Sequence, residues 1–388
     1  MKKIKVSLTG VGGYGRTHYN LIRSLVKNGM LDLCGVVIRR SSMEKYADNV
    51  RELAEMNVPV FHSDEELLNS IHPDLAVLPV GISAHRTLSE LYLNAGVNVL
   101  LEKPAAGSIA DVDEMIACEK RSKAFLAVAF QDMYSPEIRS IKQRILNGDF
   151  GKLKSIAMEG IWLRNDTYYN RNAWSGKLRD AKGFPVLDSP VNNAFAHFLN
   201  IALFCAGKSF EETAHPETMQ AELVRVRPEI ETFDVCAIRI RANEIPILTL
   251  MSHVGSEKRD PTIRFDFEKG KLFWSQTTGK QWSFILPDGT VAETHTDNLA
   301  QTDMYRIMSA KINGGNEFIY TLENAREHTF AIEKLHELFS VKTVKGVLNG
   351  TQYDLPGITA VFDECFEKSL LPGEAGASWG TAVPEKKL

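Results

Sequence analysis

A glycine-rich turn near the N-terminus has the spacing that binds dinucleotides. The segment TGVGGYGRTHY places Gly10, Gly12 and Gly15 in a GxGxxG pattern. In such a pattern the first glycine permits a tight turn, the second lets the backbone approach a pyrophosphate, and the third allows a helix to pack closely on a strand. The N–H groups at the start of that helix would face the anion. The pattern predicts a nucleotide-binding loop; the alternative is a turn that is merely rich in glycine.

The residues after the second expected strand bear on which nicotinamide cofactor would bind. NAD-binding proteins usually carry an acid there, which accepts hydrogen bonds from the ribose, whereas NADP-binding proteins replace the acid and add a base. The chain has Ile38, Arg39, Arg40 and Ser41 and no acid at this point. Two guanidinium groups and a hydroxyl suit a 2′-phosphate, so NADP is favoured and NAD remains possible. The alternative is that these arginines belong to a solvated loop.

The stretch VNVLLEKPAA is an apolar strand that stops abruptly on Glu102, Lys103 and Pro104. Charges are costly to bury unless they are paired. Ligands of open α/β sheets bind at the carboxyl ends of the strands, where an ammonium group can polarise or protonate a developing alkoxide. Pro104 biases Lys103 toward an extended backbone. The pair is therefore a candidate site, with a solvated turn as the alternative.

The segment WLRNDTYYNRNAWSGKL, residues 162–178, is dense in aromatic and basic side chains. Aromatic rings stack on the C–H faces of sugars, while Arg and Asn bond hydroxyls or a carboxylate. The segment is therefore a candidate substrate loop. A subunit interface, where Tyr, Trp and Arg are also enriched, and ordinary core packing are the alternatives.

The elements that must position these residues fall into two regions. The first region alternates strands and helices, and it predicts a parallel, doubly wound sheet of the Rossmann type. Its expected strands are 4–9, 33–38, 58–61, 75–80, 97–101 and 125–130, and its first helix is 14–27. The second region predicts a mainly antiparallel open sheet with helices on one face. Its expected strands are 153–162, 219–227, 233–241, 245–253, 262–267 and 272–285, and its expected helices are 136–146, 188–204, 302–312 and 322–339.

The fold class is therefore α/β, with a Rossmann domain followed by an α+β domain. A chain of 388 residues is too long for one ordinary core, which also favours two domains. We place the NAD(P)-binding domain at residues 1–130 and the substrate and oligomerisation domain at 131–355. The tail, 356–388, is expected to pack on a domain, across the first one, or on a partner subunit.

Composition and the remaining motifs exclude several classes of protein. The net charge of −4, without a long basic run, argues against a nucleic-acid or membrane surface. Five scattered cysteines without a CxxC pair favour reduced thiols, and the start MKKIKVSLTG lacks a signal h-region, so a cytoplasmic location is expected. No metal is expected, because the ten histidines form no HxxxH or HExxH motif, and no GxSxG nucleophile motif occurs.

Several segments together resemble the Gfo/Idh/MocA family, which includes glucose–fructose oxidoreductase and inositol dehydrogenase. These segments are GVGGYGRTHY, His85 after the fourth expected strand, AGVNVLLEKPAA and PEIRSIKQRILNGDFGKL, in that order. The resemblance runs over most of the chain. It implies hydride transfer between a nicotinamide and a carbon of a sugar or cyclic polyol. It also implies that the open sheet of the second domain forms subunit contacts, as in a homodimer or homotetramer.

The resemblance assigns roles to particular residues. The family lysine of EKP lies beside the nicotinamide and the reacting hydroxyl, which implies that role for Lys103, with Glu102 helping to form the cofactor pocket. The family also carries Asp-x-x-x-His on a helix. In LDSPVNNAFAHFLNIALFCAG this motif fits either Asp188 with Asn192, or Asn193 with His197. Spacing to the helix end favours the second register, in which the later family Asp is Asn200.

In the favoured register His197 is the candidate general base, because histidine exchanges protons near neutral pH. Asn193 can bond the substrate but cannot hold the negative charge of an Asp. The alternative is that His197 only packs its helix onto the sheet.

The candidate site residues fall into three sets according to their expected role. The catalytic candidates are Lys103, His197 and Asn193. The cofactor candidates are Gly10, Gly12, Gly13, Tyr14, Gly15, Arg39, Arg40, Ser41, Gly81, His85, Glu102, Lys103 and Gln131. The substrate candidates are Trp162, Arg164, Tyr169, Asn172, Trp174 and Asp188.

The leading hypothesis is a dehydrogenase or reductase that prefers NADP and acts on a sugar, sugar acid or cyclitol. The second is redox-assisted elimination of a glycoside with tightly bound NAD(P). The third is a dinucleotide-binding sensor without catalysis.

Overall fold

The computed structural model describes residues 2–276, 280–298 and 301–388, and these divide into two compact units. The first unit is Met1–Tyr134 with Leu299–Arg326, and the second is Ser135–Asn298 with Glu327–Leu388. The expected boundary at residue 130 lies close to Tyr134. The sequence placed residues 301–326 with the second domain, whereas they cluster with the first unit.

Contacts of α9 and Tyr320 explain why this segment belongs to the first unit. Helix α9 (Gln301–Ile312) packs on α1 (Gly15–Lys27) and on the short helix η3 (Gln131–Tyr134). The carbonyl oxygen of Tyr320 also accepts the N–H of Val128 at 2.8 Å, at the open edge of the sheet. These contacts join segments that are distant in sequence, which periodicity alone does not reveal.

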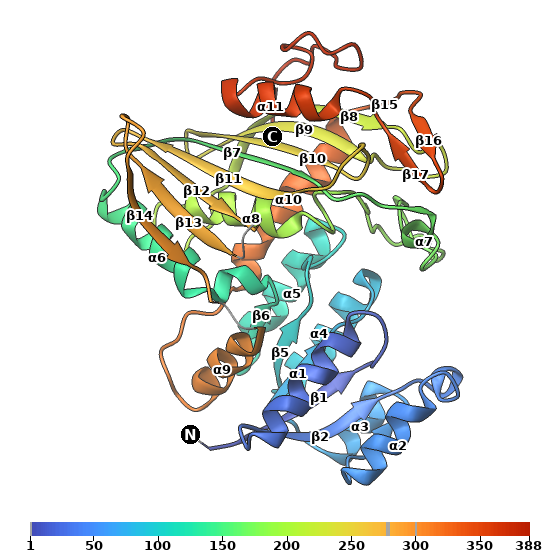
Figure 1. The fold of residues 1–388 in the computed structure, drawn as a ribbon. Coiled ribbons are helices and arrows are strands. Elements are labelled where there is room, and N and C mark those ends of the chain that lie inside the picture. The colour runs from blue at the N-terminus through green and yellow to red at the C-terminus, as the bar shows by residue number, and fades with distance from the viewer. Residues whose placement is uncertain (1, 277–279, 299–300) are drawn as a thin grey trace. The chain divides into compact units, whose positions relative to one another are not determined.

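The first unit is built around a six-stranded sheet in which every pairing is parallel (Figure 1). In spatial order the strands are β3 (Val60–Phe61), β2 (Leu31–Val37), β1 (Ile4–Thr9), β4 (Leu75–Leu78), β5 (Asn98–Leu101) and β6 (Leu126–Val128). Its other helices are α2 (Ala47–Glu55), α3 (Asp64–Ser70), α4 (His85–Asn94) and α5 (Ile109–Arg121). This is the Rossmann order. Successive strands are added toward one edge of the sheet from β1 to β3 and toward the other edge from β4 to β6, and such sheets bind ligands at the point between β1 and β4 where this order switches. The predicted fold class is confirmed.

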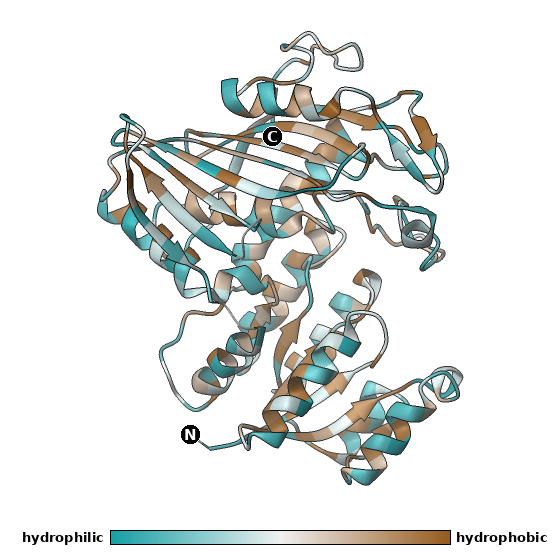
Figure 2. Cartoon of the chain, in the orientation of Figure 1, coloured by the Kyte–Doolittle hydropathy of each residue, from teal (hydrophilic) through white to brown (hydrophobic). Residues whose placement is uncertain are grey.

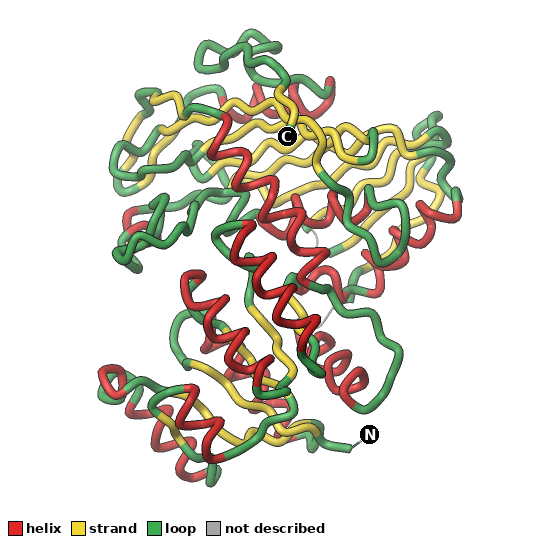
Figure 3. The backbone as a smooth tube through the Cα atoms, turned by 180° about the vertical axis from the view of Figure 1, so that it is seen from behind, coloured by secondary structure: helices red, strands yellow, loops and turns green. Residues whose placement is uncertain are grey.

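The strands of the first sheet are apolar because helices cover both faces. All four residues of β4 are buried, and so are Val99, Leu100 and Leu101 of β5. Figure 2 shows β2 and β5 largely in the hydrophobic colour, and Figure 3 shows from behind how helices alternate with these strands.

The second unit holds a large sheet that is mainly antiparallel. In spatial order its strands are β14 (Val291–Thr296), β13 (Gln281–Ile285), β12 (Lys271–Ser275), β11 (Arg259–Phe267), β7 (Leu153–Ile161), β10 (Ile245–Ser252), β9 (Val235–Ala242), β8 (Pro216–Arg225) and β15 (Val341–Thr343), with β18 (Lys386–Lys387) also on β8. The pairs β7–β10 and β8–β15 are parallel. A separate hairpin is formed by β16 (Val347–Asn349) and β17 (Gln352–Asp354).

One predicted strand, 272–285, was wrong as a single element. It consists of β12 and β13, which pair antiparallel, and residues 277–279 lie outside the described residues. The pairing sets the indole of Trp274 opposite that of Trp282, and both are fully buried. A single straight strand would separate these two large side chains.

Helices α6 (Pro136–Asn147) and α8 (Ala196–Cys205) lie along one face of the second sheet, and α11 (Ile358–Lys368) lies on the other (Figure 1). The remaining helices are α7 (Asp166–Tyr169) and α10 (Leu322–Leu338). The predicted helix 188–204 begins too early, because residues 190–195 form turns and α8 starts at Ala196. The side chain of Asn192 donates to the carbonyl oxygens of Val186 and Leu187, which holds the turn conformation.

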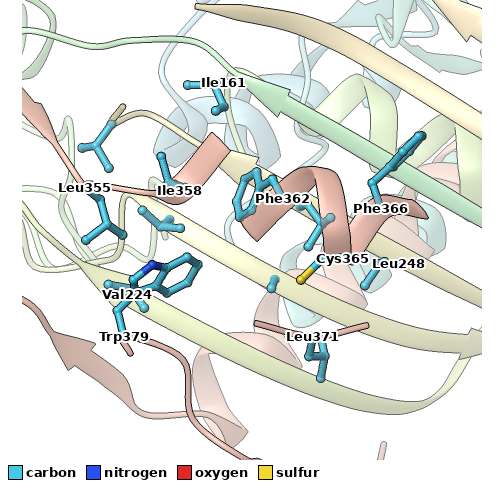
Figure 4. Packing of buried hydrophobic residues seen from close by; sticks show 14 of the residues in the cluster. Ile161, Val224, Leu248, Leu355, Ile358, Phe362, Cys365, Phe366, Leu371 and Trp379 are labelled. Atoms are coloured by element: carbon cyan, nitrogen blue, oxygen red, sulfur yellow. The ribbon is translucent and has the colours of Figure 1, made fainter. Parts of the chain in front are cut away.

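The tail packs on the sheet of its own unit. Ile358, Phe362, Cys365 and Phe366 repeat at helical spacing, so α11 has one apolar face. That face and the indole of Trp379 are buried against apolar residues of the sheet, among them Val224, Ala237 and Leu248 (Figure 4). The final strand β18 then pairs with β8.

The cysteines and the lengths of the helices were also compared with the sequence-based expectations. The five cysteines are free thiols, and four of them are buried. No helix within the described ranges is long and apolar enough to cross a membrane.

Candidate functional site

The glycine loop joins β1 to α1, and its backbone requires small residues. Gly10 has φ +90°, a conformation that residues with a side chain rarely adopt. A Cβ on Gly15 would lie 2.6 Å from the carbonyl oxygen of Gly10, so α1 can approach the loop only with glycine there. A Cβ on Gly12 would collide with the hydroxyl of Tyr46, which packs over the loop.

A cavity of about 510 Å³ opens beside this loop. Its walls come from the ends of β1, β2, β3 and β4 and the turns that follow them. Of the predicted cofactor residues, it is lined by Gly10, Gly12, Arg39 and Gly81. Arg40 and Ser41 are exposed and do not line it, whereas Ser42 and Tyr46 do. The carboxyl edge of the sheet at its switch point is therefore hollow, as a dinucleotide site requires.

An acid that the sequence analysis missed, Asp64, also lines this cavity. Its carboxylate accepts hydrogen bonds from the hydroxyls of Thr9 at 2.6 Å and Tyr92 at 2.8 Å. Burial raises the pKa of Asp64, although these hydrogen bonds and the charge of Arg39 act in the opposite direction. The signal was available, because the capping residue Ser63 marks a helix start directly after β3, at the same sheet edge.

The charged end of β5 is stabilised by a buried network. The carboxylate of Glu102 lies 2.9 Å from Nε2 of His18 and accepts the N–H of Lys103 at 3.0 Å. The other ring nitrogen of His18 lies 2.5 Å from the hydroxyl of Tyr305. Burial alone would raise the pKa of Glu102, but the hydrogen bond and charge of His18, with the charge of Lys103, hold the pKa below its usual value. Glu102 is thus a paired carboxylate that fixes the turn carrying Lys103.

The sequence analysis missed both partners of Glu102. His18 lies within the glycine motif, four residues into α1, and its spacing from the loop was an available signal. Tyr305 comes from α9, whose place in the first unit was not foreseen.

His85 contacts the same turn through hydrogen bonds to backbone carbonyl oxygens. Its ring nitrogens lie 3.0 Å from the carbonyl oxygen of Pro104 and 3.2 Å from that of Val80, and the side chain is buried. Burial lowers its pKa, although the hydrogen bonds to these carbonyl oxygens act in the opposite direction. The peptide bond between Lys103 and Pro104 is cis. His85 therefore positions the turn and does not line the cavity.

Two more cofactor candidates, Tyr14 and Gln131, contact each other in the first unit. The hydroxyl of Tyr14 donates to the side-chain oxygen of Gln131 at 3.5 Å, and Gln301 donates to the same oxygen at 3.0 Å. Gln301, from α9, was also missed. Gly13, with φ +54°, is exposed in the glycine loop.

In the second unit, Asn193 joins two predicted site segments. Its amide donates to Asp188 at 2.8 Å and to the hydroxyl of Tyr168 at 3.2 Å. Asp188 is buried, and its second oxygen accepts the N–H of Gly176 at 2.6 Å. Asn193 lies in the turn before α8 and His197 in its first turn, and both are partly exposed.

The two registers place different side chains at the histidine position of the motif. In the alternative, Asn192 takes the histidine position, but its amide is buried and bonds backbone carbonyls. Asn200, the position of the later family Asp, is fully buried. Lys103 belongs to the first unit, and Asn193 and His197 belong to the second.

The aromatic segment is arranged around Tyr168, not Tyr169. The guanidinium carbons of Arg171 and Arg164 lie 3.5 and 4.6 Å from the centre of the Tyr168 ring. Tyr169 instead contacts the guanidinium of Arg227, at 4.9 Å. Tyr168 is therefore the tyrosine that contacts the two arginines of the segment.

The other members of the segment have structural partners. Trp162 stacks on Phe195 with ring centres 4.8 Å apart, and its N–H donates to Asp260 at 2.9 Å. The side-chain oxygen of Asn172 accepts the backbone N–H groups of Trp174 and Ser175 and so closes a turn. Trp174 lies 5.6 Å from the guanidinium of Arg171. Asn172 thus shapes the loop.

His253, buried beside Tyr168, makes the second unit sensitive to acid. Burial, with the charges of Arg164 and Arg171, lowers its pKa to about 3. An unfolded histidine has a pKa of about 6.5, so below that pH the unfolded chain binds a proton that the folded chain excludes. We expect the free energy of unfolding to fall as the pH drops from about 6.5 toward 3. Urea titrations at stepped pH should show a shallower fall for His253→Phe than for the wild type; equal slopes would contradict this assignment.

Metal ligation has no candidate in the described part of the chain, where no group of three or more His, Cys, Asp or Glu residues could hold an ion.

The parallel sheet, the glycine loop at its switch point and the adjoining cavity define a dinucleotide-binding Rossmann domain. Residues 4–130 match the family described as "Oxidoreductase family, NAD-binding Rossmann fold", GFO_IDH_MocA. These residues, the first domain of the chain, are thus similar to the NAD-binding domain of the Gfo/Idh/MocA oxidoreductases, the family that the sequence resembles.

The chain is also similar to curated oxidoreductases over part of their length. The chain is 25% identical over 202 residues to putative oxidoreductase YteT of Bacillus subtilis, which covers 50% of the chain and 42% of YteT. It is 24% identical over 153 residues to inositol 2-dehydrogenase of Salmonella typhimurium, covering 38% of the chain and 43% of that protein. The chain thus spans less than half the length of these relatives.

A solved structure extends the likeness to the whole fold. The WlbA dehydrogenase of Bordetella pertussis, in complex with NADH and UDP-GlcNAcA, has a TM-score of 0.71 and 18% identity, covering 87% of this chain and 96% of that one. At this identity the match concerns the fold alone.

Proposed function

We propose that the protein is an NAD(P)-dependent oxidoreductase that transfers a hydride between the nicotinamide and a carbinol or carbonyl carbon of a sugar, sugar acid or cyclitol. The observation that carries the proposal is the shared sheet edge in the first unit, where the glycine-loop cavity and the Glu102–Lys103 turn both lie at carboxyl ends of parallel strands. The names of the relatives, an inositol dehydrogenase and a dehydrogenase holding NADH and a sugar acid, support the substrate class.

The first unit fits a dinucleotide. The tight backbone at Gly10 and Gly12 and the start of α1 present N–H groups suited to a pyrophosphate. When bound, the dinucleotide supplies the hydride acceptor or donor. Arg39 would contact the adenosine ribose end, because it lines the cavity after β2.

The proposed chemistry divides between two side chains. The ammonium of Lys103 would hydrogen-bond the oxygen on the reacting carbon and stabilise its developing charge. His197 would take up or release the hydroxyl proton, and Asn193 would orient the substrate. Glu102, His18 and His85 keep the lysine turn in place and are positioning residues.

NADP is the favoured cofactor because Arg39 and Ser42 line the cavity and can bond a 2′-phosphate. Arg39→Ala is expected to raise the KM for NADP at least tenfold and to change the KM for NAD little. Arg40→Ala is the matched control, since Arg40 is equally exposed but lies outside the cavity lining. Equal effects on both cofactors would contradict the preference and would favour Asp64 as an acceptor for the ribose hydroxyls of NAD.

The assembly and location of the protein are also proposals. A homodimer or homotetramer through the second sheet was expected, but α11 and Trp379 cover one of its faces. A subunit contact on that side would therefore use the outer surface of the tail. The free cysteines fit the proposed cytoplasmic location.

A further inference from the structure

We propose that the second unit carries an anion subsite, formed by Arg164 and Arg171 around Tyr168, that selects a substrate bearing a carboxylate. This inference rests on the proposed function for the reaction and narrows its substrate class. Sugar acids would then be preferred to neutral sugars and cyclitols.

The first support is the way in which the two guanidinium groups are held. Both lie against the ring of Tyr168, at 3.5 Å for Arg171 and 4.6 Å for Arg164. Arg171 also lies 5.6 Å from the ring of Trp174. Stacking on aromatic rings orients a guanidinium while leaving its N–H donors free for an anion. The arrangement is therefore preorganised, which lowers the entropy cost of binding.

The second support is a positive charge without an internal counter-ion. Neither guanidinium is within 4.0 Å of a carboxylate oxygen among the described residues, and Nε of Arg164 is buried without a hydrogen-bond partner there. Other arginines of the same unit are paired: Arg227 with Asp166, Arg264 with Asp266, and Arg259 with Asp363. Arg164 is half-buried and Arg171 is exposed, so both guanidinium groups can accept an anion from solvent without first losing a carboxylate partner.

The third support is the charge balance. Burial, with the nearby charge of Asp188, raises the pKa of Tyr168. Two contacts of Asp188 are the N–H of Gly176 and the amide of Asn193. His253 is neutral, as its low pKa requires. Two guanidiniums and one carboxylate leave an excess of one positive charge. That excess matches a singly charged carboxylate better than a doubly charged phosphate.

The fourth support is the position of the subsite beside residues proposed for the chemistry. Asn193 donates to the Tyr168 hydroxyl at 3.2 Å and precedes His197 by one helical turn. The amide at Asn193 is neutral, where the family resemblance implies an Asp. A neutral group there avoids repulsion of an anionic substrate, which gives the substitution a physical reason.

The test compares four compounds with the full chain and NADP: glucuronate, glucose, myo-inositol and glucose 6-phosphate. Reduced nicotinamide formation gives kcat and KM, and calorimetry gives binding of each compound. Arg171→Gln and Arg164→Gln are the test variants. Arg179→Gln, an exposed arginine nearby that bonds the Gly183 carbonyl, is the control. Arg171 is exposed, so its variant is expected to fold, which circular dichroism checks.

We expect the wild type to bind glucuronate more tightly than the other three compounds. Arg171→Gln should raise the KM for glucuronate at least tenfold with kcat nearly unchanged, which marks loss of ground-state binding, while Arg179→Gln changes neither. Arg171→Lys should restore part of the binding. Preference for a neutral compound or the phosphate, or equal losses for charged and neutral compounds, would overturn the subsite.

The same measurements distinguish failure of the proposed oxidoreductase function from failure of the anion subsite. If none of the compounds reduces NADP yet glucuronate binds and Arg171→Gln abolishes that binding, the oxidoreductase proposal fails and the subsite stands. If glucuronate does not bind to the folded wild type, the subsite is overturned whatever the activity.

Discussion

Lys103→Ala is expected to lower kcat by about 10²- to 10⁴-fold, the range that a positioned acid or base contributes. The backbone N–H of Lys103, which bonds Glu102, remains in the variant, and so does the pairing of Glu102 with His18. The turn should therefore keep its shape. Because the side chain acts on the reacting oxygen, the affinity for the dinucleotide should change no more than a few-fold.

Steady-state kinetics on the preferred substrate, with dinucleotide binding measured separately, would check this expectation. Lys123→Ala serves as the control, since Lys123 is exposed in the first unit after α5. A Lys103→Ala variant that keeps wild-type kcat would remove Lys103 from the chemistry.

Phe362→Ala is expected to destabilise the second unit by about 3–5 kcal/mol, the usual cost of removing a large aromatic side chain from a core. Phe362 is fully buried on α11, in the cluster that joins the tail to the sheet (Figure 4). Its loss would leave a cavity between α11 and strands such as β10, which α11 contacts. The midpoint of urea unfolding, followed by tryptophan fluorescence, measures the effect.

Phe184 supplies a matched control, because it is the same residue type with 48% of its surface exposed. Phe184→Ala should change stability by less than about 1 kcal/mol. If the two substitutions had equal effects, the tail would not pack on this sheet as described.

The fold could be predicted because its signals are local. Apolar runs such as 75–78 and 97–101 alternate with helical spacing, and the glycine loop falls at the first strand–helix junction. The parallel sheet and its class follow from these features, and so does the similarity of residues 4–130 to the family model. The position of Lys103 at the end of β5 follows as well, because strand ends in a parallel sheet share an edge.

The remaining features depend on contacts between distant segments. Tyr305 reaches His18 only because α9 returns to the first unit. Asp64, at the start of α3, meets Thr9 at the end of β1 and Tyr92 on α4. The helix predicted from Asp188 was wrong because the Asn192 side chain bonds the backbone and stabilises turns. Tyr168 and Tyr169 are adjacent aromatic residues, so composition could not tell which one meets the arginines.

The most direct test of the central claim is a calorimetric titration of NADP and of NAD into the wild-type chain. The account predicts one dinucleotide bound per chain at the glycine-loop cavity, with each cofactor displacing the other and NADP binding more tightly. A folded chain that binds neither dinucleotide would contradict it.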